Sequence, residues 1–67
     1  MKKIGNVLAT LRKEKGITQD EIAQKLRVDR STISKWETEA HMINAYTLIE
    51  YLHVLDVSAI EFENAME

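Results

Sequence analysis

The sequence contains no cysteine and no proline, only two glycines and only 6% aromatic residues. Without cysteine the chain forms no disulfide and offers no thiolate to a metal ion. Its longest run without a charged residue, 40–49, is far too short to span a bilayer, and the first residues lack the apolar core of a signal peptide. With 67 residues, 45% of them hydrophobic and 30% charged, the chain is predicted to form one small cytoplasmic domain over residues 1–67.

Basic residues are also missing, but only from the second part of the chain. All nine lysines and arginines lie in residues 1–35 together with four acids, which gives this part a net charge of +5. Residues 36–67 hold seven acids and no base, so their net charge is −7 and the total is −2. This division predicts a basic surface for a polyanion and an acidic surface that faces away from it. Two solvated faces that merely differ in charge are the simpler alternative.

The spacing of apolar residues and the capping residues predict helices. Ile4, Val7, Leu8 and Leu11 lie at i, i+3, i+4 and i+7 of a first helix over residues 2–15. We expect Gly16 to end this helix in a left-handed conformation.

The next two helices are marked by their first residues. Thr18 and Glu21 have the spacing of a capping box at the start of a second helix. Asp29 is suited to cap a third helix over residues 30–37, and Asn44 to cap a fourth.

The fourth helix carries many apolar residues. Its predicted inner face consists of Tyr46, Leu48, Ile49, Leu52 and Leu55. Asp56 is expected to end this helix, and Ser58 with Glu61 predicts a second capping box and a short fifth helix. Since strand alternation is absent beyond a few residues, the predicted fold is an all-α bundle of five short helices.

The second and third helices have the pattern of a helix-turn-helix over about residues 18–37. Ala23 is small enough for a close helix crossing, and the apolar residues that fill the angle are Ile22, Leu26, Val28, Ile33 and Trp36. We expect Arg27 to occupy a turn position that favours a positive φ, and Trp36 to pack in the core rather than to stack on a base.

The predicted outer face of the third helix is polar. It consists of Arg30, Ser31, Thr32, Ser34 and Lys35, two cations and three hydroxyls that suit phosphates and base edges in the major groove. Gln19 and the free N–H groups at the start of the second helix are placed to meet a phosphate. Ordinary surface hydroxyls are the alternative.

The segments that carry the helix-turn-helix pattern run from Leu11 to Leu26 and from Val28 to Glu37. With the closing segment 52–62 they resemble the Cro and lambda-repressor-like family of transcription regulators, also called the xenobiotic-response-element (XRE) type. The resemblance covers roughly residues 4–62. It implies a lambda-repressor-like fold and sequence-specific binding to double-stranded DNA, usually as a homodimer on a palindromic operator and most often to repress transcription.

The resemblance also implies roles for individual residues. The implied base contacts are Arg30, Ser31, Ser34 and Lys35, and the implied phosphate contacts are Gln19, Thr32, Arg12 and Thr18. Arg12 and Glu37 are expected to form a structural ion pair between the first and third helices. An ordinary surface pair of little energetic value is the alternative.

Two features depart from the family pattern. The segment 38–43 after the third helix contains one acid and no lysine or arginine, whereas many relatives have a phosphate-binding loop there. Ile60 lies where many relatives are polar, and together with Met42, Ile43, Tyr46 and Met66 it is a candidate dimer surface. Scattered surface hydrophobic residues are the alternative.

The sequence shows no pattern for catalysis, for a cofactor or for a metal. No nucleophile and base occur in a familiar order, and His41 and His53 have no cysteine or carboxylate spacing of a metal site. We therefore expect a protein that is not an enzyme and has no small-molecule substrate. The main alternative function is a protein-interaction module, an antirepressor or antitoxin subunit that binds a protein partner through its acidic C-terminal half.

Overall fold

The computed structural model describes residues 2–67 and contains five helices and no strand in that range. The helices are α1 (Ile4–Glu14), α2 (Gln19–Leu26), α3 (Arg30–Glu37), α4 (Ala45–Leu55) and α5 (Ala59–Met66). The predicted all-α fold of five short helices is confirmed. Within the described range, no helix has both the length and the apolarity needed to cross a membrane.

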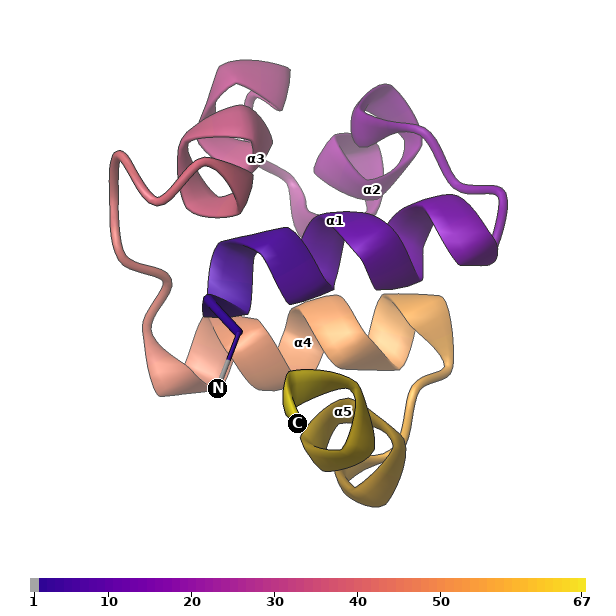
Figure 1. Ribbon diagram of the computed structural model, residues 1–67. Coiled ribbons are helices and arrows are strands. Elements are labelled where there is room, and N and C mark those ends of the chain that lie inside the picture. The colour runs from indigo at the N-terminus through magenta and orange to yellow at the C-terminus, as the bar shows by residue number, and fades with distance from the viewer. Residues whose placement is uncertain (1) are drawn as a thin grey trace.

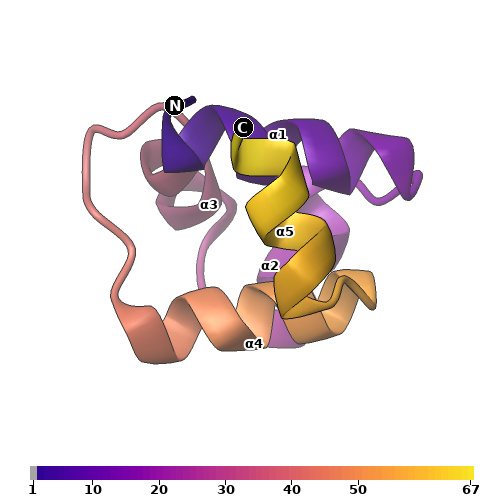
Figure 2. The same ribbon diagram turned by 60° about the horizontal axis from the view of Figure 1, so that its bottom comes forward.

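Helices α1 and α4 lie along opposite edges of the molecule in Figure 2. Figure 1 shows α2 and α3 on one side of α1, with α4 and α5 on the other side. α1 contacts both α3 and α5, and α2 contacts α4 as well as α3. Figure 2 shows α5 crossing from the end of α4 toward the start of α1, where the backbone N–H of Lys2 donates to the carbonyl of Met66 at 3.1 Å.

Most of the predicted caps are present. Thr18 and Glu21 form the complete capping box, with Thr18 Oγ1 accepting from the Glu21 N–H at 3.1 Å and the Glu21 carboxylate accepting from the Thr18 N–H at 2.9 Å. Asn44 accepts from the N–H of Thr47 at 2.8 Å. At α5, Ser58 accepts from the N–H of Glu61 at 3.1 Å, which is one half of the box that we expected.

One predicted cap and one predicted helix start are wrong. Asp29 precedes α3, but its side chain makes no capping hydrogen bond. α1 begins at Ile4 rather than at residue 2, and Lys3 provides no side-chain cap. The cap of α1 comes instead from Glu39, whose Oε2 accepts from the N–H of Gly5 at 2.7 Å. A contact between residues this far apart in the sequence leaves no local pattern.

Gly5 is also the point where α1 lies closest to the end of α3. A Cβ atom at this position would lie 2.5 Å from the carbonyl oxygen of Trp36 and 2.6 Å from that of Glu37. Both atoms belong to the backbone and do not move aside as a flexible side chain would. Only glycine therefore permits this packing of α1 against α3.

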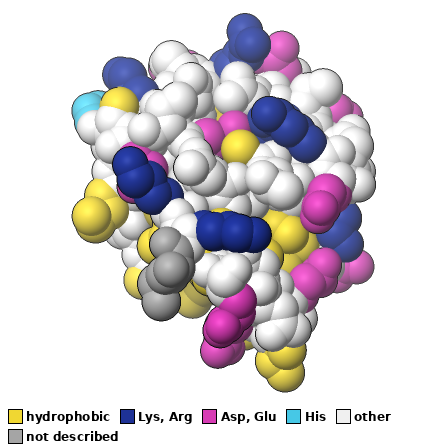
Figure 3. Space-filling view, viewed as in Figure 1, with side chains coloured by type: hydrophobic (Ala, Val, Ile, Leu, Met, Phe, Trp, Pro, Cys, Tyr) yellow, Lys and Arg dark blue, Asp and Glu magenta, His cyan; other side chains and the backbone are white. Residues whose placement is uncertain are grey.

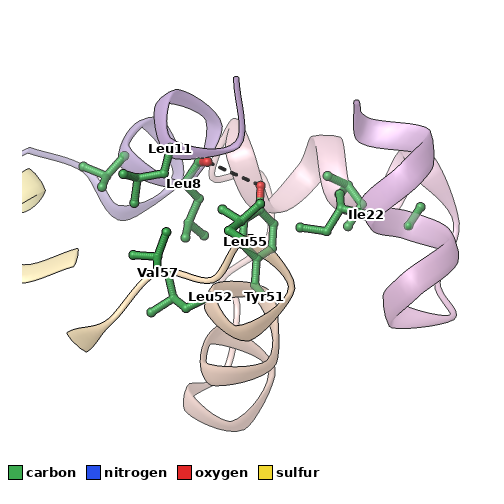
Figure 4. Packing of buried hydrophobic residues seen from close by; sticks show 10 residues of the cluster. Leu8, Leu11, Ile22, Tyr51, Leu52, Leu55 and Val57 are labelled. Carbon is green, nitrogen blue, oxygen red and sulfur yellow. Dashed lines mark hydrogen bonds between the residues drawn. The ribbon is translucent and has the colours of Figure 1, made fainter. Parts of the chain in front are cut away.

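The buried residues of the hydrophobic core come from α1, α2, α3, α4 and the turn before α5. Its buried members are Val7, Leu8, Leu11, Ile22, Ala23, Ile33, Tyr51, Leu52, Leu55 and Val57 (Figure 4). Trp36 is half-buried and packs against this cluster, as the sequence predicted.

The predicted inner face of α4 is partly wrong. Tyr46 and Ile49 are exposed, whereas Tyr51, which the prediction omitted, is fully buried. Apolar residues occur nearly all round α4, so the sequence pattern of this helix does not show which side faces the core. The burial of Tyr51 depends on a hydrogen-bond partner from another helix.

Candidate nucleic-acid interface

The turn between α2 and α3 is short and fixed by its backbone. Arg27 has φ 59° and ψ 44°, the predicted left-handed conformation, and the N–H of Val28 donates to the carbonyl of Ala23 at 3.0 Å. Ile22 and Ile33 are fully buried on either side of the turn. The inner sides of both helices are thereby held against the core, which leaves the opposite side of α3 exposed.

The outward side of α3 carries residues that were expected to contact bases and, in the case of Thr32, a phosphate. Arg30, Ser31 and Lys35 are exposed, and Ser34 and Thr32 are half-buried. Lys and Arg side chains are spread over the part of the surface formed by α1, α2 and α3, whereas the part around α4 and α5 shows none on this side (Figure 3). On this face, the basic residues are thus confined to one part of the surface, as they are to one part of the sequence.

The opposite end of α3 is anchored by a buried carboxylate. Glu37 accepts from Arg12 Nε at 2.7 Å and from Arg12 Nη2 at 3.0 Å, so the expected ion pair forms as a two-bond contact. It also accepts from Gln19 Nε2 at 3.0 Å and from the Tyr51 hydroxyl at 2.5 Å. These four side chains come from α1, α2, α3 and α4, and together they fix α3 relative to three other helices.

The surroundings determine the charge of this network. Burial alone would raise the pKa of Glu37, but the hydrogen bonds from Arg12, Tyr51 and Gln19 lower it below its ordinary value. The hydrogen bond to Glu37 raises the pKa of Arg12 despite burial. Burial and the neighbouring carboxylate raise the pKa of Tyr51, so the phenol stays protonated. The ion pair is therefore charged and supplied with donors on every side.

Some of the hydrogen-bond donors that were expected to contact phosphates are bonded within the protein instead. Only 8% of the Arg12 side chain is exposed, and its guanidinium also donates to the carbonyl of Ile17 at 2.8 Å. Three of the five N–H groups of Arg12 are occupied, which leaves two for a phosphate. Gln19 donates to Glu37 through its amide nitrogen and keeps one further N–H.

A hollow of about 840 Å³ opens between α1, α2 and α3. It is lined by Asn6, Ala9, Arg12, Lys13, Gly16, Ile17, Thr18, Gln19, Asp20, Arg30, Glu37 and Thr38. Three of the expected phosphate contacts, Arg12, Thr18 and Gln19, thus share one concave surface with Arg30. Sequence reasoning did not single out Lys13, Asn6 or Thr38, because their common location requires the packing of α1 beside α2 and α3.

The expected dimer residues are not equally available. Met42 is 93% exposed, and Tyr46 and Ile60 are exposed as well. Ile43 and Met66 are half-buried and pack against the core, so they contribute less to any outer surface. Ile49, which was assigned to the inner face, is exposed and lines a hollow of about 530 Å³ between the end of α4 and the start of α5.

Comparison with known proteins places these features in a family. The family model described as Helix-turn-helix matches residues 8–62. Among solved structures, the wild-type restriction-modification controller protein C.Esp1396I is similar with a TM-score of 0.86 and 30% sequence identity, over 94% of this chain and 81% of the controller protein. No curated protein matches the chain significantly.

Proposed function

The chain belongs to the helix-turn-helix family and is a DNA-binding transcription regulator, and from this premise we propose that it represses transcription as a homodimer on a palindromic operator. The observation that carries the proposal is the outward side of α3. Arg30, Ser31 and Lys35 are exposed there, while Ile33 on the opposite side is fully buried. A rigid polar helix of this kind fits the major groove.

The base contacts in this proposal come from Arg30, Ser31, Ser34 and Lys35. The guanidinium of Arg30 matches the O6 and N7 acceptors of guanine, and the two serine hydroxyls can donate or accept. Lys35, on the last turn of α3, adds a positive charge. Each good two-bond base contact contributes about 1–3 kcal/mol of discrimination.

The phosphate contacts come from the hollow beside α3. Thr18, Gln19 and the remaining N–H groups of Arg12 lie on this surface, and Thr32 contributes from α3. The start of α2 adds free backbone N–H groups and the positive end of its helix dipole. Lys13 also lines the hollow and supplies an uncommitted cation, which compensates for the absence of lysine and arginine from residues 38–43.

The homodimer in this proposal uses apolar residues of the loop after α3 and of helices α4 and α5. The residues assigned to it are Met42, Ile43, Tyr46, Ile60 and Met66, and the exposed Ile49 is added to them. A symmetric pair would place two α3 helices about 34–36 Å apart, one turn of DNA. The acidic surface would then face away from the phosphates.

Selection of duplexes from a random library tests the proposal. The expected result is a palindromic consensus whose half-sites are one DNA turn apart. Binding to the selected duplex must weaken steeply as the salt concentration rises. A plot of the logarithm of the binding constant against the logarithm of the salt concentration should have a slope of about −0.9 for each phosphate neutralised. A library without enrichment, or retention that does not respond to salt, would contradict DNA binding through this surface.

Two variants at one position separate base reading from charge. Arg30→Ala should cost about 1–3 kcal/mol and relax preference at one base pair of each half-site. Arg30→Lys retains the charge but lacks the planar fork, so it should recover non-specific affinity without recovering the base preference. Equal loss on all sequences for both variants would show that Arg30 contacts only the backbone.

The second candidate is a protein-interaction module, an antirepressor or antitoxin subunit. It is supported by the exposure of Met42, Tyr46 and Ile60. These residues belong to the part of the chain, residues 36–67, that contains no lysine or arginine. In that case Tyr46→Ser would abolish binding to a protein partner, and Arg30→Ala would have no effect on the chain's activity.

A further inference from the structure

An acidic residue lies within the surface that is proposed to face DNA. Asp20 is the second residue of α2, and Arg30 is the first residue of α3. Arg30 Nε lies 3.7 Å from Asp20 Oδ1, and both side chains are largely exposed, 65% and 71% respectively. Both also line the hollow between α1, α2 and α3. A carboxylate at this place opposes phosphate binding, so its presence beside Arg30 needs a separate explanation.

The pair does little for the stability of the fold. Its distance exceeds that of a hydrogen bond, and ion pairs this exposed contribute little to the free energy of unfolding. Gln19 is turned toward Glu37, so Asp20 is the residue of the first turn of α2 that meets Arg30. Asp20 is therefore placed beside Arg30 where it can influence the direction of that side chain, while it contributes little to folding.

The direction of an arginine side chain matters for base reading. A free guanidinium adopts many rotamers, and it must be held in one plane to donate two parallel hydrogen bonds to guanine. Because Asp20 approaches Arg30 from the Nε side, the two Nη groups at the end of the guanidinium stay free. These are the groups that can reach the O6 and N7 atoms of one guanine.

The same carboxylate weakens contacts that carry no sequence information. Arg30 beside Asp20 is attracted less strongly to a phosphate, since the negative charge of Asp20 repels the DNA backbone. The O6 and N7 acceptors of guanine carry no formal charge, so Asp20 repels them less than it repels a phosphate. The net result is lower affinity for non-specific DNA and a sharper choice at one base pair.

We propose that Asp20 is a specificity-determining residue, which positions Arg30 for one guanine and reduces non-specific binding to phosphates. This inference rests on the proposed function, because it requires α3 to lie in the major groove. Asp20 acts through Arg30 and is a positioning residue rather than a base contact.

The test compares Asp20→Asn, Asp20→Glu, Arg30→Ala and the double variant Asp20→Asn with Arg30→Ala. The probe is the duplex that the wild-type chain retains from a random library, together with a scrambled duplex and single-base-pair substitutions. Asp20→Asn should bind the scrambled duplex several-fold more tightly than the wild-type chain does. At the base pair read by Arg30, the ratio of its affinities for the selected and the substituted duplex should fall about three- to tenfold. Asp20→Glu should restore part of that preference.

The double variant distinguishes positioning from a general charge effect. In the Arg30→Ala background, Asp20→Asn should leave base preference unchanged, because the residue through which it acts is gone. Glu63→Gln is the matched control, since it removes one negative charge from the exposed side of α5 and should alter neither preference nor non-specific binding. Circular dichroism verifies that each variant is folded.

Unchanged base preference in Asp20→Asn, or an equal change with and without Arg30, would overturn the role of Asp20 while leaving DNA binding intact. If the wild-type chain retains no duplex, the proposed function fails and this inference fails with it. The two failures are therefore distinguishable in one experiment.

Discussion

The hydroxyl of Tyr51 on α4 donates a 2.5 Å hydrogen bond to Glu37 at the last turn of α3. Tyr51 is fully buried, so the bond passes through the core and not across the surface. It ties α3 to α4, the helix that lies along the edge opposite α1 in Figure 2. Several measurable consequences follow from this network and from the close contacts around it.

Tyr51→Phe should lower the free energy of unfolding by about 1–3 kcal/mol. The substitution keeps the aromatic packing but removes one donor from the buried carboxylate of Glu37. Urea denaturation measures the change. Tyr46→Phe is the control, since Tyr46 is exposed and its hydroxyl should contribute less than about 0.5 kcal/mol. Equal stability of the two variants would contradict the structural role of the Tyr51 hydroxyl.

Glu37→Gln should be more damaging, at about 3–5 kcal/mol, because it leaves the buried guanidinium of Arg12 without an anion. In a domain this small such a loss approaches the whole stability. The double variant Arg12→Met with Glu37→Met removes both charges and should recover part of the loss. Thermal denaturation, monitored by circular dichroism, compares the wild type with these two variants. A Glu37→Gln variant as stable as the wild type would contradict the structural role of the buried ion pair.

Acid should destabilise the fold through Glu37. Its pKa is lowered in the folded chain, so the stabilisation is present above the ordinary value of 4.5 and is lost as pH falls through the folded-state pKa. The pKa of Glu21 is lowered by its capping bond to Thr18, which acts in the same direction. Urea denaturation between neutral and acidic pH should therefore show a weaker pH dependence for Glu37→Gln than for wild type. Parallel pH profiles would refute this assignment.

Gly5→Ala should destabilise the protein by about 1–3 kcal/mol. The added methyl group would overlap the carbonyl oxygens of Trp36 and Glu37, and this overpacking outweighs the gain of about 1 kcal/mol in helix propensity. At Gly16 a Cβ atom would meet nothing within 4 Å, so Gly16→Ala costs only the strain of φ +73°. Denaturant midpoints for both variants test the comparison. A Gly5→Ala protein more stable than wild type would rule out the close approach.

Arg27→Gly should stabilise the protein by about 0.5–1 kcal/mol. The left-handed conformation with φ 59° strains a residue that has a Cβ atom, and relief of this strain exceeds the entropy lost by glycine on folding. Lys25→Gly, within the right-handed part of α2, is the control and should destabilise by about 1 kcal/mol. The same sign of effect at both positions would contradict the assigned conformation of Arg27.

The sequence revealed the helices because their determinants are local. The capping box of Thr18 and Glu21, the caps at Asn44 and Ser58, and the turn at Arg27 each involve residues within one helical turn. The side chains assigned to the outer face of α3 also followed from its periodicity alone. The ion pair between Arg12 and Glu37 came from the family resemblance, and the structure adds that it is buried.

The remaining features depend on which residues meet after folding. The sequence by itself determined that five helices form, where α2 to α5 begin, which side of α3 is polar, and how charge divides along the chain. Tertiary structure alone decided that Glu39 caps α1, that Tyr51 rather than Tyr46 is buried, and that Asp20 lies beside Arg30. The physical reason is that capping and periodicity act over three or four residues, whereas these contacts form only when separate helices pack together.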